Sequence, residues 1–177
     1  MLKVTLKDGT IREVEQGTTV LNFVKGLSNS LAKKALAAKM GDKTVDLTTK
    51  LEQDCQLAVL TFEDADGRWA LRHTASHIMA QAIKRLYKEH HVQLAIGPAI
   101  ENGFYYDIDM DKQLTEEDLK DIEKEMNKIV KENLHLERKE LSREAALKFF
   151  ADQGEGYKVE LINDLPKDAV ISLYTQG

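Results

Sequence analysis

Alternating apolar and polar residues open the chain and predict a β-hairpin. Residues 2–7 read Leu-Lys-Val-Thr-Leu-Lys, Asp8 and Gly9 follow, and residues 10–14 resume an extended pattern. An Asp-Gly pair supports the positive φ angles that a two-residue hairpin turn requires. We therefore expect two antiparallel strands joined by a tight turn.

The apolar spacing next changes to that of a helix. An apolar stripe covers residues 20–27, and Ser30 is placed to cap a second short helical turn. Residues 38–47 and 56–62 are strand-like again. A helix packed across one face of a small mixed sheet would bury all of these apolar residues. The pattern therefore predicts a β-grasp (ubiquitin-like) domain over residues 1–62, without catalytic residues of its own.

A short acidic stretch, residues 63–67, follows this domain and predicts a domain boundary. Asp66 can cap the helix that starts there and continues to Leu86. On this helix the apolar side chains fall within an arc of about 140°, which should face the core. These side chains are Ala75, Ile78, Met79, Ala82, Ile83 and Leu86.

Two histidines, His73 and His77, lie on the opposite side of the same helix, together with Ala80 and Lys84. Residues four positions apart on a helix are one turn apart on one face. Both imidazoles can therefore address the same ligand or substrate atom, which makes the pair a candidate site. Two solvated surface histidines are the alternative interpretation, and only the context can decide between them.

Two strand patterns follow and meet at an Asn-Gly pair. Residues 92–100 and 104–109 read as strands about the turn at 102–103, the strongest short signal for a hairpin. Alternation places Tyr106 on the apolar face of the second strand. Sheet core and a solvated edge are the plain interpretation of this hairpin.

A long helix is predicted to start after Thr115, because the acidic residues of its first turn suit the helix dipole. Its apolar stripe consists of Leu119, Ile122, Met126, Ile129 and Val130.

The last part of the chain predicts a strand at 134–138, a helix capped by Ser142, and two further strands at 157–162 and 169–174. Together with the preceding elements they indicate a larger α+β domain over residues 63–177. In this domain we expect the long helix to pack on an antiparallel sheet.

The composition is that of a folded globular protein. The 177 residues are 42% hydrophobic and 31% charged. The single cysteine, Cys55, excludes an intrachain disulfide and any all-cysteine metal site, and we interpret it as a small buried residue near a strand end. Signal-length and membrane-length apolar runs are absent from the sequence, so we expect a cytoplasmic protein.

The charge of −5 is unevenly distributed. Residues 1–62 hold nine basic and seven acidic side chains, whereas residues 63–177 hold sixteen basic and twenty-three acidic ones. Neither half is a basic nucleic-acid clamp. An RNA partner would have to contact regions outside this chain or a local patch, while a solvated lysine face is the alternative for the same residues. The patch would comprise Lys33, Lys34, Lys39 and Lys43.

Three motifs follow the β-grasp pattern in one order: RHTASH at 72–77, AIGP at 95–98 and NGFYYD at 102–107. In this combination the chain closely resembles the N-terminal region of bacterial threonyl-tRNA synthetases. The resemblance implies a TGS domain at 1–62. It further implies that residues 63–177 are most of the second N-terminal domain, which in this family hydrolyses tRNA charged with serine by mistake.

The resemblance also implies roles for individual residues. His73 and His77 would be catalytic, and Lys158, in the segment GEGYK, would be an editing-site lysine. Tyr106 would bind substrate in the pocket, and the partner would be tRNA(Thr) with its charged 3′ end. Without the resemblance, Lys158 would be interpreted as a surface lysine and Tyr106 as a core tyrosine.

In this family a Cys-xxx-His segment with an Asp completes the editing site, and separate domains carry the ATP, threonine and zinc sites and the expected homodimer contacts. The sequence to Gly177 has no such segment. We therefore expect that residues 1–177 alone hold no cofactor, bind no metal tightly through the two histidines, charge no tRNA and edit poorly.

Two further interpretations stay open. One is a non-catalytic regulatory or RNA-binding protein built around the TGS-like domain, with the histidines as fold residues. The other is a free-standing deacylase of the alanyl-tRNA editing type, in which related His-xxx-His helices occur.

Overall fold

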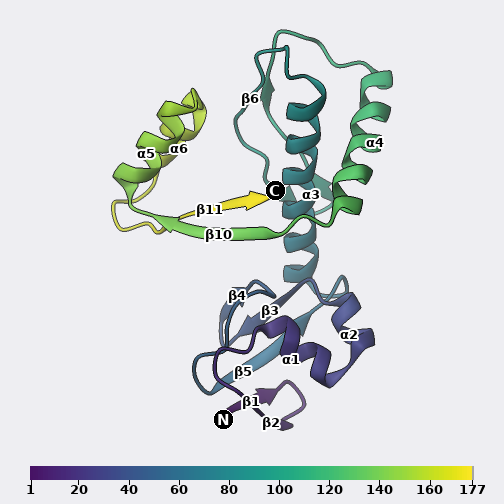
Figure 1. The fold of residues 1–177 in the computed structure, drawn as a ribbon, viewed down its shortest axis with the longest axis vertical. Coiled ribbons are helices and arrows are strands. Elements are labelled where there is room, and N and C mark those ends of the chain that lie inside the picture. The colour runs from purple at the N-terminus through teal and green to yellow at the C-terminus, as the bar shows by residue number, and fades with distance from the viewer. Residues whose placement is uncertain (177) are drawn as a thin grey trace. The chain divides into compact units, whose positions relative to one another are not determined.

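The computed structural model describes residues 1–176, which form two compact units (Figure 1). The N-terminal unit comprises residues 1–74 with 100–102, and the C-terminal unit comprises residues 75–99 with 103 onward. The division falls inside α3 (Ala65–Leu86), the longest helix described. Among the described residues no helix has the length and apolar character needed to cross a membrane.

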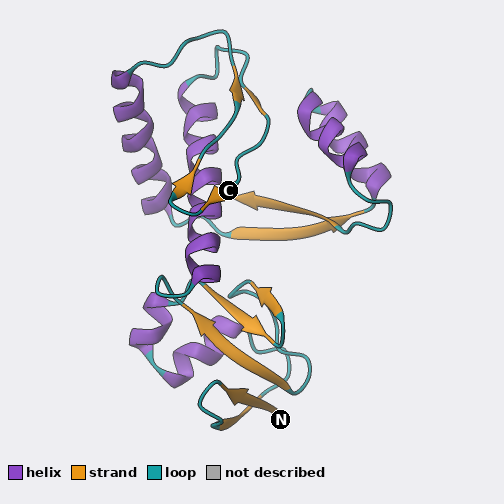
Figure 2. Ribbon diagram, turned by 180° about the vertical axis from the view of Figure 1, so that it is seen from behind, coloured by secondary structure: helices purple, strands orange, loops and turns teal. Residues whose placement is uncertain are grey.

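The N-terminal unit is built on a five-stranded mixed sheet with the order β2-β1-β5-β3-β4. The central strand, β5, is parallel to β1, and the other neighbouring pairs are antiparallel (Figure 2). This confirms the predicted β-grasp arrangement. The strands are β1 (Leu2–Leu6), β2 (Ile11–Val14), β3 (Ala37–Met40), β4 (Lys43–Val45) and β5 (Cys55–Leu60).

Two short helices, α1 (Val20–Leu27) and α2 (Asn29–Lys34), pack their apolar residues against this sheet. Apolar residues from the helices and from the strands contact one another in a single core. The sequence predicts this, because its apolar residues follow the spacing of a strand in some segments and of a helix in others. The fully or nearly fully buried members are Val4, Val20, Phe23, Val24, Ala35, Ala38, Leu51 and Leu57.

The hairpin between β1 and β2 differs from the two-residue turn that the sequence predicts. Leu6 and Thr10 are joined by a backbone hydrogen bond of 2.8 Å, which leaves three residues in the loop. Only Gly9 has a positive φ, of 82°, while the carboxylate of Asp8 accepts a hydrogen bond of 2.9 Å from the Thr10 amide. A three-residue loop with glycine in the left-handed position gives the same strand pairing.

The cap of α2 is also a correction. The hydroxyl of Ser28, and not that of Ser30, accepts a hydrogen bond of 3.2 Å from the Leu31 amide. Ser30 lies inside the helix, because α1 ends at Leu27 and α2 starts only two residues later. For α1 the cap is Thr19, which accepts a hydrogen bond from the Asn22 amide.

At the start of α3 the predicted role of Asp66 is wrong. Asp66 is the second helical residue and forms an ion pair of 3.5 Å with Lys39. Asp64, just before the helix, instead turns back and accepts a hydrogen bond of 2.8 Å from the Thr61 amide. A β-carbon on Gly67 would lie 2.0 Å from the carbonyl oxygen of Thr61, so this close approach of helix and strand end requires glycine.

One core of the C-terminal unit lies between α3 and α4 (Glu116–Glu132). Its buried residues are Ala82, Ile83, Tyr87, Ile122 and Ile129. The predicted apolar faces are therefore only partly right. Leu86 on α3 is 39% exposed, and Leu119 and Val130 on α4 are 58% and 59% exposed. Of the other members of the two stripes, Ile78, Met79 and Met126 pack against this core, whereas Ala75 is not part of it.

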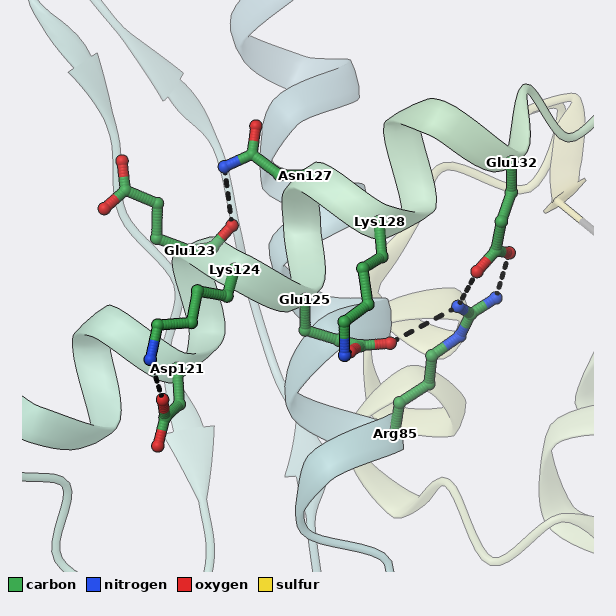
Figure 3. Close-up of polar contacts among 8 residues, drawn as sticks. All are labelled: Arg85, Asp121, Glu123, Lys124, Glu125, Asn127, Lys128 and Glu132. Carbon is green, nitrogen blue, oxygen red and sulfur yellow. Dashed lines mark hydrogen bonds and ion pairs between the residues drawn. The ribbon is translucent and has the colours of Figure 1, made fainter.

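Charged side chains join α3 to α4 along the edge of this core (Figure 3). Arg85 donates two hydrogen bonds, of 2.6 and 2.8 Å, to the two carboxylate oxygens of Glu132. A weaker contact of 3.5 Å connects Arg85 to Glu125, which also pairs with Lys128 at 2.8 Å. The Arg85 guanidinium lowers the pKa of the Glu132 carboxyl group, because it binds the charged form.

The predicted antiparallel sheet of this unit is present as separate two-stranded ribbons among the described residues. Residues 92–100 and 104–109 form broken strands: β6 pairs with β9, and β7 pairs with β8. Backbone hydrogen bonds of 3.0 and 2.8 Å still link residues 95–96 to Asp107 between them. The strands are β6 (Gln93–Leu94), β7 (Ala99–Ile100), β8 (Gly103–Phe104) and β9 (Ile108–Asp109).

The third ribbon pairs β10 (Leu136–Leu141) with β11 (Ile171–Gln176). Between these two strands the chain forms two helices, α5 (Arg143–Asp152) and α6 (Gly156–Asp164). The strand predicted at 157–162 is therefore wrong, because this segment is helical. In the helix Val159 and Ile162, three residues apart, face the same core as residues of α5. A short apolar run does not by itself distinguish a strand from a helix.

The cap of α4 offers a test of the local structure. The Thr115 hydroxyl accepts a hydrogen bond from the Asp118 amide, and the Asp118 carboxylate accepts one of 2.8 Å from the Thr115 amide. We expect Thr115→Ala to lower the free energy of unfolding by about 0.5–2 kcal/mol. Urea denaturation followed by circular dichroism measures this. Thr115→Ser keeps the hydroxyl and should lose less, and equal losses for both variants would contradict the capping role.

Candidate functional site

His73 lies on α3 within the N-terminal unit, and its side chain is half-buried. Its ring centroid is 5.0 Å from that of Trp69, one turn earlier on the helix, at an angle of 45°. Burial lowers the pKa of His73 below its ordinary value, because desolvation disfavours the imidazolium. The ring is therefore neutral at pH 7 and can accept a proton.

His77 lies one turn later on α3, is exposed, and belongs to the C-terminal unit. Because α3 is one uninterrupted helix through both positions, the two histidines lie on the same helix face. The neighbour of His77, Ser76, is completely buried and donates a hydrogen bond of 3.1 Å to the carbonyl oxygen of Gly97. This bond fixes the loop between β6 and β7 against α3.

Gly97 in turn positions Tyr106. A β-carbon at Gly97 would lie 2.3 Å from two atoms of the Tyr106 ring, so the ring rests directly on the glycine backbone. Tyr106 is half-buried and lies in the irregular stretch between β8 and β9, outside any strand. Burial, together with the charge of Glu155, raises the pKa of its phenol. Tyr106 therefore stays protonated and can donate a hydrogen bond.

Lys158 lies in the first turn of α6. Its ammonium group is 3.6 Å from a carboxylate oxygen of Glu155 and 5.1 Å from the centroid of the Phe150 ring. Burial lowers the pKa of Lys158, and the charge of Glu155 opposes that shift only in part. The side chain is 30% exposed, so it is mostly buried but still accessible to solvent.

The structure thus places three of the four predicted site residues, His77, Tyr106 and Lys158, in one unit. Lys158 and Tyr106 both respond to the carboxylate of Glu155, and His77 is next to the serine that fixes the loop under Tyr106. His73 belongs to the other unit and shares α3 with His77.

Sequence reasoning missed Glu155, which is buried, with only 8% of its surface exposed. Its carboxylate binds the ammonium group of Lys84 on α3 as well as that of Lys158. The three-residue spacing between Glu155 and Lys158 is a signal for an ion pair in a helix. It was not recognised because the segment was predicted as a strand.

The lysines proposed as an RNA patch are spread over the N-terminal unit. Lys33 and Lys34 end α2, Lys39 lies on β3 and pairs with Asp66, and Lys43 starts β4. Cys55 is the first residue of β5 and is half-buried, and burial raises the pKa of its thiol. Within residues 1–176 no group of three or more His, Cys, Asp or Glu side chains is arranged to hold a metal ion.

Comparison with known proteins assigns the N-terminal part first. The TGS domain family matches residues 2–61, which correspond to the β-grasp sheet and its helices. Curated relatives match the whole chain. It is 60% identical to a threonine–tRNA ligase of Clostridium acetobutylicum over 177 residues, and 56% identical to those of Clostridium kluyveri and Clostridium novyi.

In each of these matches all of the chain is aligned, but it spans only 28% of the relative's length. The aligned part is the N-terminal part of the relatives. The chain therefore contains a TGS domain and is similar, over its whole length, to the N-terminal part of threonine–tRNA ligases.

Proposed function

We propose that this chain supplies the TGS domain and the editing portion of an enzyme that ligates threonine to tRNA(Thr) with ATP. The editing portion would hydrolyse seryl-tRNA(Thr) formed by mistake. The observation that carries this proposal is that Lys158 and Tyr106 are both within the electrostatic influence of one buried carboxylate, that of Glu155, which is bridged to the helix carrying His73 and His77. The whole-length similarity to threonine–tRNA ligases supports the choice of tRNA.

The need for such a site follows from the small difference between the two amino acids. Serine lacks one methyl group of threonine, and a missing methyl group changes binding by only about 1–3 kcal/mol. A synthetic site that accepts threonine therefore cannot reject serine strongly by binding alone. A second site that hydrolyses the wrong ester supplies the remaining discrimination.

The chemistry of the ester hydrolysis assigns a role to each side chain. A water molecule attacks the carbonyl carbon of the seryl ester, and the neutral imidazole of His73, with His77, accepts or relays its proton. Lys158 stabilises the negative charge that develops on the carbonyl oxygen. The intermediate then collapses, the ribose oxygen of the terminal nucleotide leaves with a proton, and the products are serine and free tRNA.

Tyr106 would line the pocket for the charged 3′ end of tRNA(Thr), with its phenol as a hydrogen-bond donor. The half-buried ring lies directly against the Gly97 backbone, which supports a place in a pocket wall. Residues 1–62 would then be a TGS domain without catalytic residues, and the editing domain would start near residue 63.

The remaining parts of the proposed enzyme lie in segments that this chain does not include. They would carry the ATP and threonine sites, a catalytic zinc and the contacts of a homodimer, and the enzyme would work in the cytoplasm. The segment with a Cys, a His and an Asp that completes the editing site would also lie there, so residues 1–177 would supply only part of that site.

The choice of substrate tests this function. A full-length threonine–tRNA ligase carrying this sequence should hydrolyse seryl-tRNA(Thr) and leave threonyl-tRNA(Thr) largely intact. The measurement is the release of labelled amino acid from each charged tRNA under single-turnover conditions. A preference for seryl- or glycyl-tRNA(Ala) would indicate a deacylase of the alanyl type instead. Binding of tRNA without any hydrolysis would indicate a regulatory or RNA-binding protein.

A further inference from the structure

Glu155 is a charged residue in a place where charges are rarely tolerated. It is 8% exposed, and its side chain does not cap the helix α6 that begins just after it. A buried carboxylate is costly unless it is paired with cations or hydrogen-bond donors. The backbone holds it in place, because the Glu155 amide donates a hydrogen bond of 3.0 Å to the Phe150 carbonyl oxygen.

Two lysines from different helices share this one carboxylate. Lys84 of α3 binds the Oε1 atom, and Lys158 of α6 lies 3.6 Å from the Oε2 atom. Lys84 and Glu155 are 71 residues apart in the sequence, so the bridge connects α3 to the start of α6. Two positive charges against one negative charge leave the cluster with a net charge of +1.

The ammonium group of Lys158 has a neighbour on each of two sides and is partly open to solvent. Glu155 lies on one side and the Phe150 ring, 5.1 Å away, on another. The contact of 3.6 Å is a longer ion pair, and an ammonium group has three N–H donors, so this contact with Glu155 does not use all of them. With 30% of the side chain exposed, they can reach a substrate oxygen.

We propose that Glu155 is a positioning residue for Lys158, held in place by Lys84, so that the ammonium group of Lys158 points toward the substrate carbonyl oxygen. The proposal rests on the editing function proposed above and deepens it. Lys84 neutralises Glu155 from one side, which leaves the charge of Lys158 available for the developing oxyanion. The bridge also ties the position of Lys158 to α3, the helix that carries His73 and His77.

The surrounding charges give the arrangement of Glu155, Lys84 and Lys158 a measurable signature. The groups that act on Lys158 are Glu155, which raises its pKa, and Lys84, which lowers it, and Glu155 also acts on Tyr106. Removal of the charge of Glu155 should therefore lower the pKa of Lys158 further. Removal of the charge of Lys84 should raise it.

The first experiment measures this pKa in the 177-residue chain by NMR titration of the lysine side-chain signals. The variants are Glu155→Gln and Lys84→Met, and Lys158→Met assigns the signal. Glu160→Gln, which removes an exposed carboxylate from the same helix, is the matched control. We expect opposite shifts for the first two variants and no shift for the control. Should Glu155→Gln not fold, Lys84→Met decides alone, and the absence of a rise overturns the proposal.

The second experiment separates this proposal from the editing function. In the full-length ligase, Glu155→Gln should reduce the single-turnover rate of seryl-tRNA(Thr) hydrolysis by roughly 10²-fold with tRNA binding unchanged, since a small misplacement of a catalytic group has effects of that size. Glu155→Asp keeps the charge and should recover part of the rate. A loss with Lys158→Ala but none with Glu155→Gln overturns the positioning role alone. No loss with Lys158→Ala overturns the role of Lys158 in editing, while the pKa shifts would remain.

Discussion

Replacement of His73 by alanine in a full-length threonine–tRNA ligase with this N-terminal sequence should reduce hydrolysis of seryl-tRNA(Thr) by about 10²–10⁴-fold, the range typical of a general acid or base. The imidazole is half-buried and its pKa is lowered by that burial, so it is present as the proton-accepting form at pH 7. The rate should fall only when the pH drops below the lowered pKa. The measurement is single-turnover deacylation across this pH range.

Two controls accompany the His73 variant. His135→Ala removes an exposed histidine of the same unit as Lys158 and should leave the rate unchanged. The free energy of unfolding of His73→Ala should stay close to that of the original chain, because the ring is only half-buried. A deacylation rate that is unaffected by His73→Ala would favour the interpretation of the two histidines as fold residues of a non-catalytic protein.

Replacement of Ile129 by alanine should lower the free energy of unfolding of the C-terminal unit by about 2–5 kcal/mol. Ile129 is 0% exposed and packs in the core between α3 and α4, so its truncation removes buried contacts and leaves a cavity. Urea denaturation of the 177-residue chain, followed by circular dichroism, measures the change.

The next residue along α4 provides the matched control. Val130 is 59% exposed, although the sequence pattern includes it in the apolar stripe, and Val130→Ala should change the stability by less than about 0.5 kcal/mol. Equal losses at the two positions would mean that α4 presents a different face to α3. The bidentate pair between Arg85 and Glu132 fixes the same face independently (Figure 3).

The elements that could be predicted from sequence are those with a local cause. Thr115 and Ser142 cap α4 and α5 as expected, because a cap depends only on residues within one turn. The sheet and helices of the N-terminal unit could be predicted because apolar residues alternate with polar ones in the strands and recur at helical spacing in the helix.

The errors have causes that lie outside the local sequence. The segment with Val159 and Ile162 alternates like a strand but forms α6, because its apolar residues find their partners on α5. The predicted strand through Gly97 is broken, because the ring of Tyr106 lies against the glycine backbone. Neither partner can be identified from residues that are near in the chain.

The same distinction applies to the candidate site. The spacing of His73 and His77 on one helix is visible in the sequence, since it depends on the helix alone. The pairing of Glu155 with Lys84 is not visible, because 71 residues separate them. Lys158 and Tyr106 were identified through resemblance to a family, and the structure adds the buried carboxylate to which both respond.

A crystal structure of the full-length ligase with a seryl-adenosine analogue, in which an amide replaces the ester, tests the editing site most directly. We expect the carbonyl oxygen of the analogue within hydrogen-bond reach of Lys158, about 2.6–3.2 Å or one water away, with His73 and His77 on the side of the attacking water. An analogue bound elsewhere, or bound with its carbonyl group far from Lys158 and both histidines, would contradict the account.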